Sequence, residues 1–232
     1  MSYLDNIFIR NINKNEIKLI FELGSRDLQD AVKLYNYYNC KVYAFECNPD
    51  CLIECKKILQ QCKDDKIKQN LILVESAVSL MDEDVTFYPF NLTKYNNMGS
   101  SSMLKIDFSM RNSDDMDYNK ENPQDEIKVN GIRLDTFMDK NNIFNIDMLC
   151  IDLQGYELNA LKSLGDYLHK VKYIITECSI VNSYTNGAIF TELNEYLQKY
   201  NFKYVCSNKF GYNFPNLNLT GFSEFDALFV RM

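Results

Sequence analysis

Hydrophobic runs alternate with amphipathic segments along most of the 232-residue chain. Runs rich in β-branched and aromatic residues predict strands at 17–23, 41–46, 71–75, 147–152, 172–178, 202–207 and 226–231. Apolar residues at helical spacing predict helices near 27–39, 49–62, 156–165 and 189–200. Strands that alternate with helical crossovers are typical of a largely parallel sheet. The pattern therefore predicts an α/β fold, with helices opening at Asp27 and at Asn48-Pro49.

Residues 91–128 break this rhythm. The segment is polar, contains Gly99 and three consecutive serines, and carries an acidic cluster at Asp114, Asp115 and Asp117. Its flanks, 85–90 and 127–134, alternate enough to be extra strands. Two interpretations stay open, a cover anchored at both ends and a surface loop without a role. With no internal repeat or linker, we expect one domain over 1–232 with this insertion.

Composition narrows the class of protein. The chain is 46% hydrophobic and 25% charged, which suits one sizeable soluble domain. Its net charge of -7 makes nucleic acid an unlikely partner, because such binding depends on clustered basic residues. The first residues lack a signal-peptide pattern and no apolar run reaches membrane-spanning length, so we expect a cytoplasmic protein without a membrane partner. Nothing in the sequence selects an oligomeric state.

The eight cysteines lie mostly in apolar segments, which predicts reduced, buried thiols. Cys47, Cys51 and Cys55 recur every four residues and could in principle chelate a soft metal from one helix face. There is no Cys-x-x-Cys pair, however, and the single histidine, His169, is far along the chain. The sequence therefore favours core packing and predicts no bound metal.

The turn after the first predicted strand, "FELGSRD", is the first candidate for chemistry. Ligands of open α/β sheets bind beyond the carboxyl ends of the strands. Gly24 allows the backbone to bend and leaves room for a ligand, and Glu22 brings a carboxylate to the rim. Glu46 ends the second strand twenty-two residues after Gly24, where a carboxylate can accept both hydroxyls of a ribose. The spacing indicates a nucleoside-containing ligand, the alternative being that both carboxylates are solvated strand-end charges.

The residues around this turn narrow the choice of nucleoside. A dinucleotide site needs Gly-x-Gly-x-x-Gly, but this turn has one glycine, and a P-loop is also absent. A nicotinamide-dependent oxidoreductase is therefore disfavoured. Glu22 and Asp27 would repel a pyrophosphate and suit a ligand with a cationic centre and an ammonium group. S-adenosyl-L-methionine has both.

Several motifs together resemble the FkbM-type methyltransferases, a branch of the class I S-adenosylmethionine-dependent enzymes. They are "FELGSRDLQDA", "VYAFECNPD", "LILVESAVS", "GSSSM", "IRLDTFMDKNNIFNIDMLCIDLQGYELNALKSLG" and "YIITECS". The resemblance implies a Rossmann-like, seven-stranded, mostly parallel sheet with helices on both faces and an antiparallel last strand. It also implies O-methylation, often of a hydroxyl on a sugar, glycan or small molecule.

The resemblance also implies roles for individual residues. The methionine part of the cofactor would contact Glu22, Gly24, Ser25 and Asp27. The ribose and adenine would contact Glu46, Cys47, Asn48, Ser76 and Ala77. Asp152, Gly155 and Glu157 would face the reacting centre with Glu177 beside them, and substrate contacts are expected from Ser102, Gln154 and Glu157. The chain departs from the family in its single turn glycine and in Gln154, which stands where the family usually has glutamate.

Methyl transfer is an in-line displacement at a sulfonium carbon, so catalysis depends largely on alignment. A base helps an alcohol to attack, and with His169 expected at the surface it should be a carboxylate. Asp152 is the first candidate and Glu177 the second, although Asp152 could instead only shape the cofactor pocket. Two other functions stay open, an RNA-cap or other nucleic-acid methyltransferase and a non-catalytic nucleoside-binding interaction protein.

Overall fold

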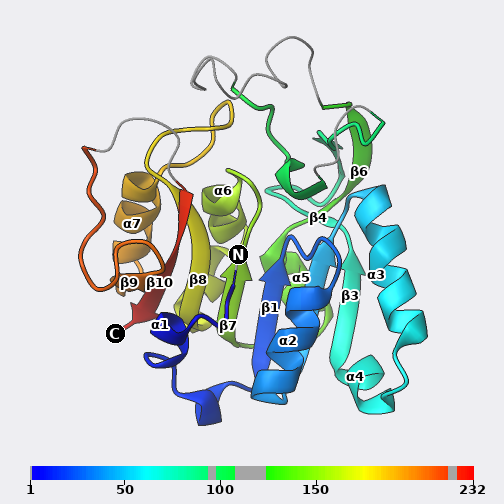
Figure 1. Ribbon diagram of the computed structural model, residues 1–232, viewed down its shortest axis with the longest axis horizontal. Helices are drawn as coiled ribbons and strands as arrows, with labels where there is room; N and C mark the ends of the chain where they lie inside the picture. The colour runs from blue at the N-terminus through cyan, green and yellow to red at the C-terminus, as the bar shows by residue number, and fades with distance from the viewer. Residues whose placement is uncertain (1, 94–97, 108–123, 219–223) are drawn as a thin grey trace.

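The computed structural model describes residues 2–93, 98–107, 124–218 and 224–232. Its centre is a seven-stranded sheet of order β3-β2-β1-β7-β8-β10-β9 (Figure 1). The strands are β1 (Leu19–Leu23), β2 (Lys41–Glu46), β3 (Leu71–Glu75), β7 (Ile146–Ile151), β8 (Val171–Ser179), β9 (Phe202–Ser207) and β10 (Glu224–Arg231). All seven predicted strands are present within a few residues of the predicted bounds.

The strand directions match the expected topology. β1 pairs in parallel with β2 on one side and with β7 on the other. The last strand, β10, lies between β8 and β9 and is antiparallel to both. The chain builds outward from β1 through β2 to β3 and then crosses back to β7, so the strand order reverses between β1 and β7. This reversal is where ligands of open α/β sheets bind.

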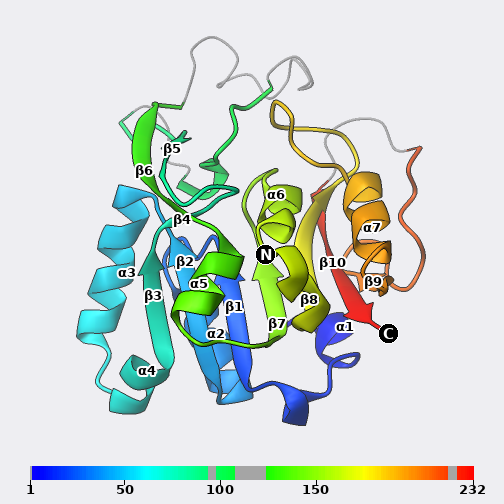
Figure 2. The ribbon, with the colours of Figure 1, turned by 180° about the vertical axis from the view of Figure 1, so that it is seen from behind.

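Helices cover both faces of the sheet (Figures 1 and 2). One face carries α1 (Asn6–Ile9), α2 (Gln29–Tyr38), α3 (Pro49–Gln61) and α4 (Asp65–Asn70), and the other carries α5 (Leu134–Lys140), α6 (Glu157–Lys162) and α7 (Phe190–Gln198). Within β1, Phe21 and Leu23 pack into one core cluster and Ile20 into the other. Burial on both faces explains why the strands read as continuous apolar runs.

A small second sheet lies above the carboxyl end of β3 (Figure 1). It has the order β4-β6-β5, with β4 (Ala77–Val78), β5 (Asp84–Phe87) and β6 (Ile127–Ile132). β5 and β6 pair antiparallel, so the strands predicted to flank the polar insertion hold its two ends together. The acidic cluster at Asp114, Asp115 and Asp117 lies outside the described residues.

All eight cysteines are unpaired, and six of them are buried, as predicted. The described residues contain no group of three or more His, Cys, Asp or Glu side chains arranged to hold a metal. In that part of the chain, no helix has both the length and the apolar character needed to cross a membrane. His169 is exposed and stacks against Tyr200 with 4.8 Å between ring centres, which confirms its predicted place at the surface.

Candidate active site

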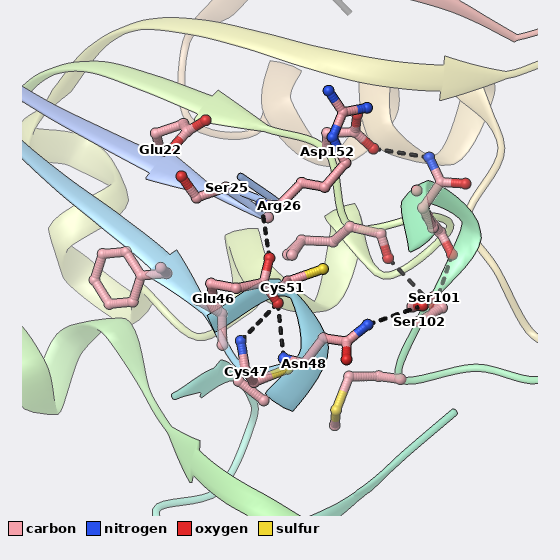
Figure 3. A pocket seen from close by; sticks show the side chains of 18 of the residues that line it. Glu22, Ser25, Arg26, Glu46, Cys47, Asn48, Cys51, Ser101, Ser102 and Asp152 are labelled. Carbon is pink, nitrogen blue, oxygen red and sulfur yellow. Dashed lines mark hydrogen bonds between the residues drawn. The ribbon is translucent and has the colours of Figure 1, made fainter. Parts of the chain in front are cut away.

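A cavity opens at the carboxyl ends of β1, β2 and β7, where the strand order reverses (Figure 3). Most of the predicted site residues line it: Glu22, Gly24, Ser25, Glu46, Cys47, Asn48, Ser76, Ala77, Ser102, Asp152 and Gln154. The structure does not bring four of the predicted residues to the cavity wall: Asp27, Gly155, Glu157 and Glu177. The cavity therefore collects residues from the ends of four strands, β1, β2, β3 and β7, and from the polar insertion.

The β1 turn is shaped by its contact with the β7 turn. Gly24 has φ of +85°, and a Cβ atom there would lie 1.9 Å from the carbonyl oxygen of Asp152. The amides of Gly24 and Ser25 both donate to the carbonyl of Phe45, at 3.0 Å each. Only glycine suits this combination of positive φ and close approach. The side of Gly24 where a Cβ would lie is filled by the backbone of Asp152, while Gly24 itself lines the cavity.

Glu46 joins the β1 and β2 turns. Its Oε2 accepts the amide of Arg26 at 2.7 Å, and its Oε1 accepts the amides of Cys47 at 2.8 Å and Asn48 at 2.7 Å (Figure 3). Burial raises the pKa of Glu46, and these three amides oppose that rise. A carboxylate offers about four acceptor positions, so about one remains, on Oε2. Glu46 thus organises both turns and can accept about one further hydrogen bond, fewer than the two that we expected from a ribose.

Glu22 and Ser25 are buried beside the cavity without a clear partner. Glu22 is 1% exposed and Ser25 is 3% exposed. Neither Glu22 Oε2 nor Ser25 Oγ makes a hydrogen bond of good geometry with any described residue. Burial raises the pKa of Glu22 to about 8, and the nearby Ser25 hydroxyl opposes that rise. Because buried polar groups without partners are costly, this pair fits a ligand that brings its own polar atoms.

Acidic side chains outnumber basic ones in the cavity wall. The carboxyl groups belong to Glu22, Asp30, Glu46 and Asp152, whereas Arg26 is the one basic side chain among the described lining residues. The Arg26 side chain is 54% exposed and lies 3.5 Å from Asp27, so its charge is screened by water and by a neighbour. A cationic group on a ligand would therefore be stabilised in the cavity.

Asp152 and Glu177 are joined by one amide. Asp152 follows β7, and its backbone N–H donates to the carbonyl of Leu23 at 3.0 Å. The Nε2 of Gln154 donates to Asp152 Oδ1 at 2.8 Å and to Glu177 Oε2 at 2.7 Å. Burial raises the pKa of both carboxyls, and proximity to Asp152 adds to the rise at Glu177. Asp152 reaches the cavity, and Glu177 stands behind it.

Two of the predicted residues serve the local backbone instead of the cavity wall. Glu157 is 3% exposed, and its Oε1 accepts the amides of Leu153 at 2.9 Å and Gly155 at 3.2 Å. It therefore closes the turn that leads into α6. Asp27 is partly exposed and accepts the amide of Gln29 at 3.2 Å. The N-cap of α2 is Leu28, one residue after the predicted Asp27, and it makes no side-chain cap hydrogen bond.

The serine-rich part of the insertion forms one wall of the cavity. Asn48 Nδ2 donates to Ser101 Oγ at 3.2 Å, and Ser102 Oγ donates to the carbonyl of Gln154 at 2.8 Å (Figure 3). The segment is thereby tied to the β2 turn on one side and to the β7 turn on the other. This part of the insertion is therefore part of the cavity wall.

Sequence reasoning missed several lining residues, including Tyr3, Arg26, Asp30, Cys51 and Phe87. Asp30 and Cys51 lie one helical turn or less from predicted residues, so their spacing could have identified them. Tyr3 carries no comparable signal, because it lies far along the chain from the first turn and only tertiary packing brings it to the cavity.

Comparisons with known proteins identify the family and the fold. A family model described as the methyltransferase FkbM domain matches residues 25–204. A sequence search of curated proteins found no significant match. The crystal structure of an FkbM methyltransferase from Methylobacillus flagellatus KT has a TM-score of 0.57 at 10% identity, covering 97% of this chain and 48% of that chain. The chain thus spans about half the length of that protein.

Two further structures share the fold. Magnesium protoporphyrin IX methyltransferase from Synechocystis PCC 6803, with S-adenosylmethionine bound, has a TM-score of 0.50 at 8% identity and covers 97% of this chain and 74% of its own. A fibrillarin pre-rRNA processing protein from Methanococcus jannaschii has a TM-score of 0.50 at 12% identity, covering 94% and 68%. At these identities the likeness shows the fold alone. The family match covers most of the chain, and the chain therefore belongs to the FkbM family of S-adenosyl-L-methionine-dependent methyltransferases.

Proposed function

We propose that this protein methylates a hydroxyl group of a sugar, a glycan or another small molecule. The observation that carries the proposal is the acidic cavity at the strand reversal, where Glu22 Oε2 and Ser25 Oγ are buried without a well-formed hydrogen bond to a described residue, beside Glu46 and Asp152. S-adenosyl-L-methionine, when bound, supplies an electrophilic methyl group on a cationic sulfur. The low count of basic side chains in the cavity wall favours a neutral acceptor over a nucleic acid.

Different residues of the cavity suit different parts of the cofactor. Glu22 and Ser25 suit the ammonium and carboxylate of the methionine end, since one is an acceptor and the other can also donate. The remaining position on Glu46 Oε2 suits one ribose hydroxyl. Residues at the ends of β2 and β3 suit contacts to the adenine: Cys47, Asn48, Ser76 and Ala77.

Asp152 is our candidate for the general base, with Glu177 as the second. Asp152 lies at the cavity wall, and Gln154 binds only one of its oxygens, Oδ1. Its Oδ2 receives no hydrogen bond from a described residue and can take the proton of an acceptor hydroxyl. Alignment of the acceptor, for which Ser102 and the β7 turn are candidates, can contribute up to roughly 7–11 kcal/mol.

Calorimetry with S-adenosylhomocysteine, NAD and NADP tests the cofactor site. We expect S-adenosylhomocysteine to bind and the two dinucleotides not to bind. Glu46→Ala should weaken binding by roughly 10- to 150-fold, because a charge-assisted hydrogen bond contributes about 1.5–3 kcal/mol. Glu75→Ala is the matched control, since Glu75 ends the neighbouring strand but is exposed and paired with Lys56. Equal loss in both variants, or tighter binding of NAD, would contradict the assignment.

The acceptor can be found by supplying labelled cofactor with pooled glycans, nucleotide sugars or capped RNA. Label in a sugar hydroxyl supports the proposed substrate class, and label confined to RNA overturns it. With that acceptor, Asp152→Asn should lower single-turnover rates by about 10²- to 10⁴-fold, while affinity for S-adenosylhomocysteine changes much less. If Asp152→Asn reacts at the wild-type rate, either Glu177 is the base or catalysis depends mainly on alignment.

A further inference from the structure

We propose that Gln154 is a positioning residue that holds Asp152 and Glu177 in place by donating one N–H to each, and that it favours the charged form of Asp152. Gln154 is neutral, whereas glutamate at this position would place a third carboxyl group beside Asp152 and Glu177. The inference rests on the proposed function only in giving Asp152 the role of base. The arrangement of the three side chains stands independently of any bound ligand.

Three of the four hydrogen-bonding positions of the Gln154 amide group are engaged. Its Nε2 reaches Asp152 at 2.8 Å and Glu177 at 2.7 Å, and its Oε1 accepts the hydroxyl of Tyr184 at 2.8 Å. Oxygens of Asp152 and Glu177 accept hydrogen bonds here and the Tyr184 hydroxyl donates one, so the amide turns its two hydrogens toward the carboxyl groups. The reverse orientation would set Oε1 against two acceptors. The chemistry of the neighbours therefore decides the orientation of the amide.

Backbone contacts also hold Gln154 in place. Gln154 has φ of +53°, an uncommon conformation for a residue other than glycine, and its carbonyl accepts Ser102 Oγ at 2.8 Å. Tyr184 is 3% exposed and packs with Phe90 and Ile106, and it lies so close to the turn that a Cβ on Gly155 would be 3.1 Å from its ring. Strained backbone of this kind is retained where its surroundings enforce it, often at functional sites.

The electrostatic need for this amide follows from the two carboxylates that it joins. Asp152 and Glu177 repel each other, and burial disfavours the charged form of each. A hydrogen bond donated to a carboxylate favours its charged form, and Gln154 lowers the pKa of Asp152 in this way. Glutamate at position 154 would remove both donors and add a third negative charge. The pKa of Asp152 would then rise, and Asp152 would stay protonated at the pH where a general base has to accept a proton.

Carbon-13 NMR titration of the side-chain carboxyls in the unliganded protein tests the proposal. Gln154→Glu should raise the titration midpoints of Asp152 and Glu177 by about one pH unit or more. Signals are assigned with Asp152→Asn and Glu177→Gln. The matched control is Gln198→Glu, which adds the same charge at an exposed site near the end of α7 and should leave both midpoints unchanged.

Gln154→Met is the second variant, since it removes both donors without adding charge and keeps a similar length. It should also raise the midpoints. Unchanged midpoints in a folded Gln154→Met or Gln154→Glu protein would overturn the proposal. The titration needs neither cofactor nor acceptor, so its failure is distinguishable from failure to bind S-adenosylhomocysteine. In turnover assays, the rate of Gln154→Glu should recover partly at higher pH, which a purely structural defect would not produce.

Discussion

Glu22 shows how one buried side chain can report on ligand binding. Burial raises its pKa to about 8, so the carboxyl is mainly protonated at pH 7 in the unliganded protein. An ammonium group placed beside it would favour the carboxylate and lower that pKa. We therefore predict that S-adenosylhomocysteine releases up to about one proton on binding at pH 7. Calorimetry in buffers with different ionisation enthalpies measures this release.

Glu22→Gln is the variant that isolates the effect. It keeps the shape of the side chain but removes the titrating group, so proton release should largely disappear and affinity should fall by roughly 10- to 150-fold. Glu75→Gln, at an exposed strand end, should release the same amount as the wild type. If Glu22→Gln released as much as the wild type, the proton would come from another group and Glu22 would not face the ammonium.

At the scale of elements, the segment 98–107 lies across the cavity and is fastened to three parts of the fold. Ser101 and Ser102 bind the β2 and β7 turns, and the backbone of 105–107 pairs with 183–185 beyond β8, at 3.0 and 2.7 Å. Segment 98–107 has to break these contacts to open away from the cavity, so its opening has a free energy of its own that can be measured. A ligand bound beneath the segment would make this opening less frequent.

Proteolysis measures this opening, because cleavage follows the population of the open form when opening is fast. We predict that cleavage within 98–107 decreases when S-adenosylhomocysteine binds and decreases further when an acceptor is added. Ser102→Ala should increase cleavage by about 2- to 12-fold, the factor for losing a hydrogen bond of about 0.5–1.5 kcal/mol. Thr93→Ala, which removes a local bond to Asn91 elsewhere in the insertion, should leave it unchanged. Cleavage that ignores every bound ligand would exclude a role as a cover.

At the scale of the whole molecule, buried carboxyls gather along one edge of the central sheet. Burial raises the pKa of Glu22 to about 8, of Glu157 to about 7 and of Asp226 to about 6. In the unfolded chain these groups titrate near their ordinary values of 4.5 and 3.8. Between about pH 4 and pH 8 the folded protein therefore binds more protons than the unfolded chain. Stability must fall as the pH rises through this window.

We predict that the melting temperature of the unliganded protein declines by several degrees from pH 5 to pH 8, which scanning calorimetry measures. Each unit of pKa shift corresponds to about 1.4 kcal/mol at full effect. Glu22→Gln should flatten the upper part of the curve and be more stable than the wild type at pH 8. Glu16 and Asp82 have pKa values lowered by their partners, so they titrate below this window. A melting temperature that rises from pH 5 to pH 8 would contradict the burial of these carboxyls.

Much of the architecture could be predicted from the sequence because it depends on local patterns. Continuous apolar runs predicted the central strands, since both sheet faces are covered and most positions along these strands pack against a core. Asn48 opens α3 with Pro49 behind it, as the residue types alone indicated. Glu22, Glu46 and Asp152 could be placed at the cavity because carboxyl ends of parallel strands share one edge of a sheet.

The tertiary structure decided which groups meet at that edge and which hydrogen bonds each of them already makes within the protein. Gly24 is needed because the Asp152 carbonyl lies against it, and three amides leave Glu46 about one acceptor position. Gln154 meets Glu177 and Tyr184 across 23 and 30 residues of chain. Residue spacing along one strand cannot specify such contacts, because they depend on strand order and on the turns that carry the side chains. The sequence by itself therefore determined the fold and the edge where the chemistry lies, and packing determined the hydrogen bonds that set the charge of the site.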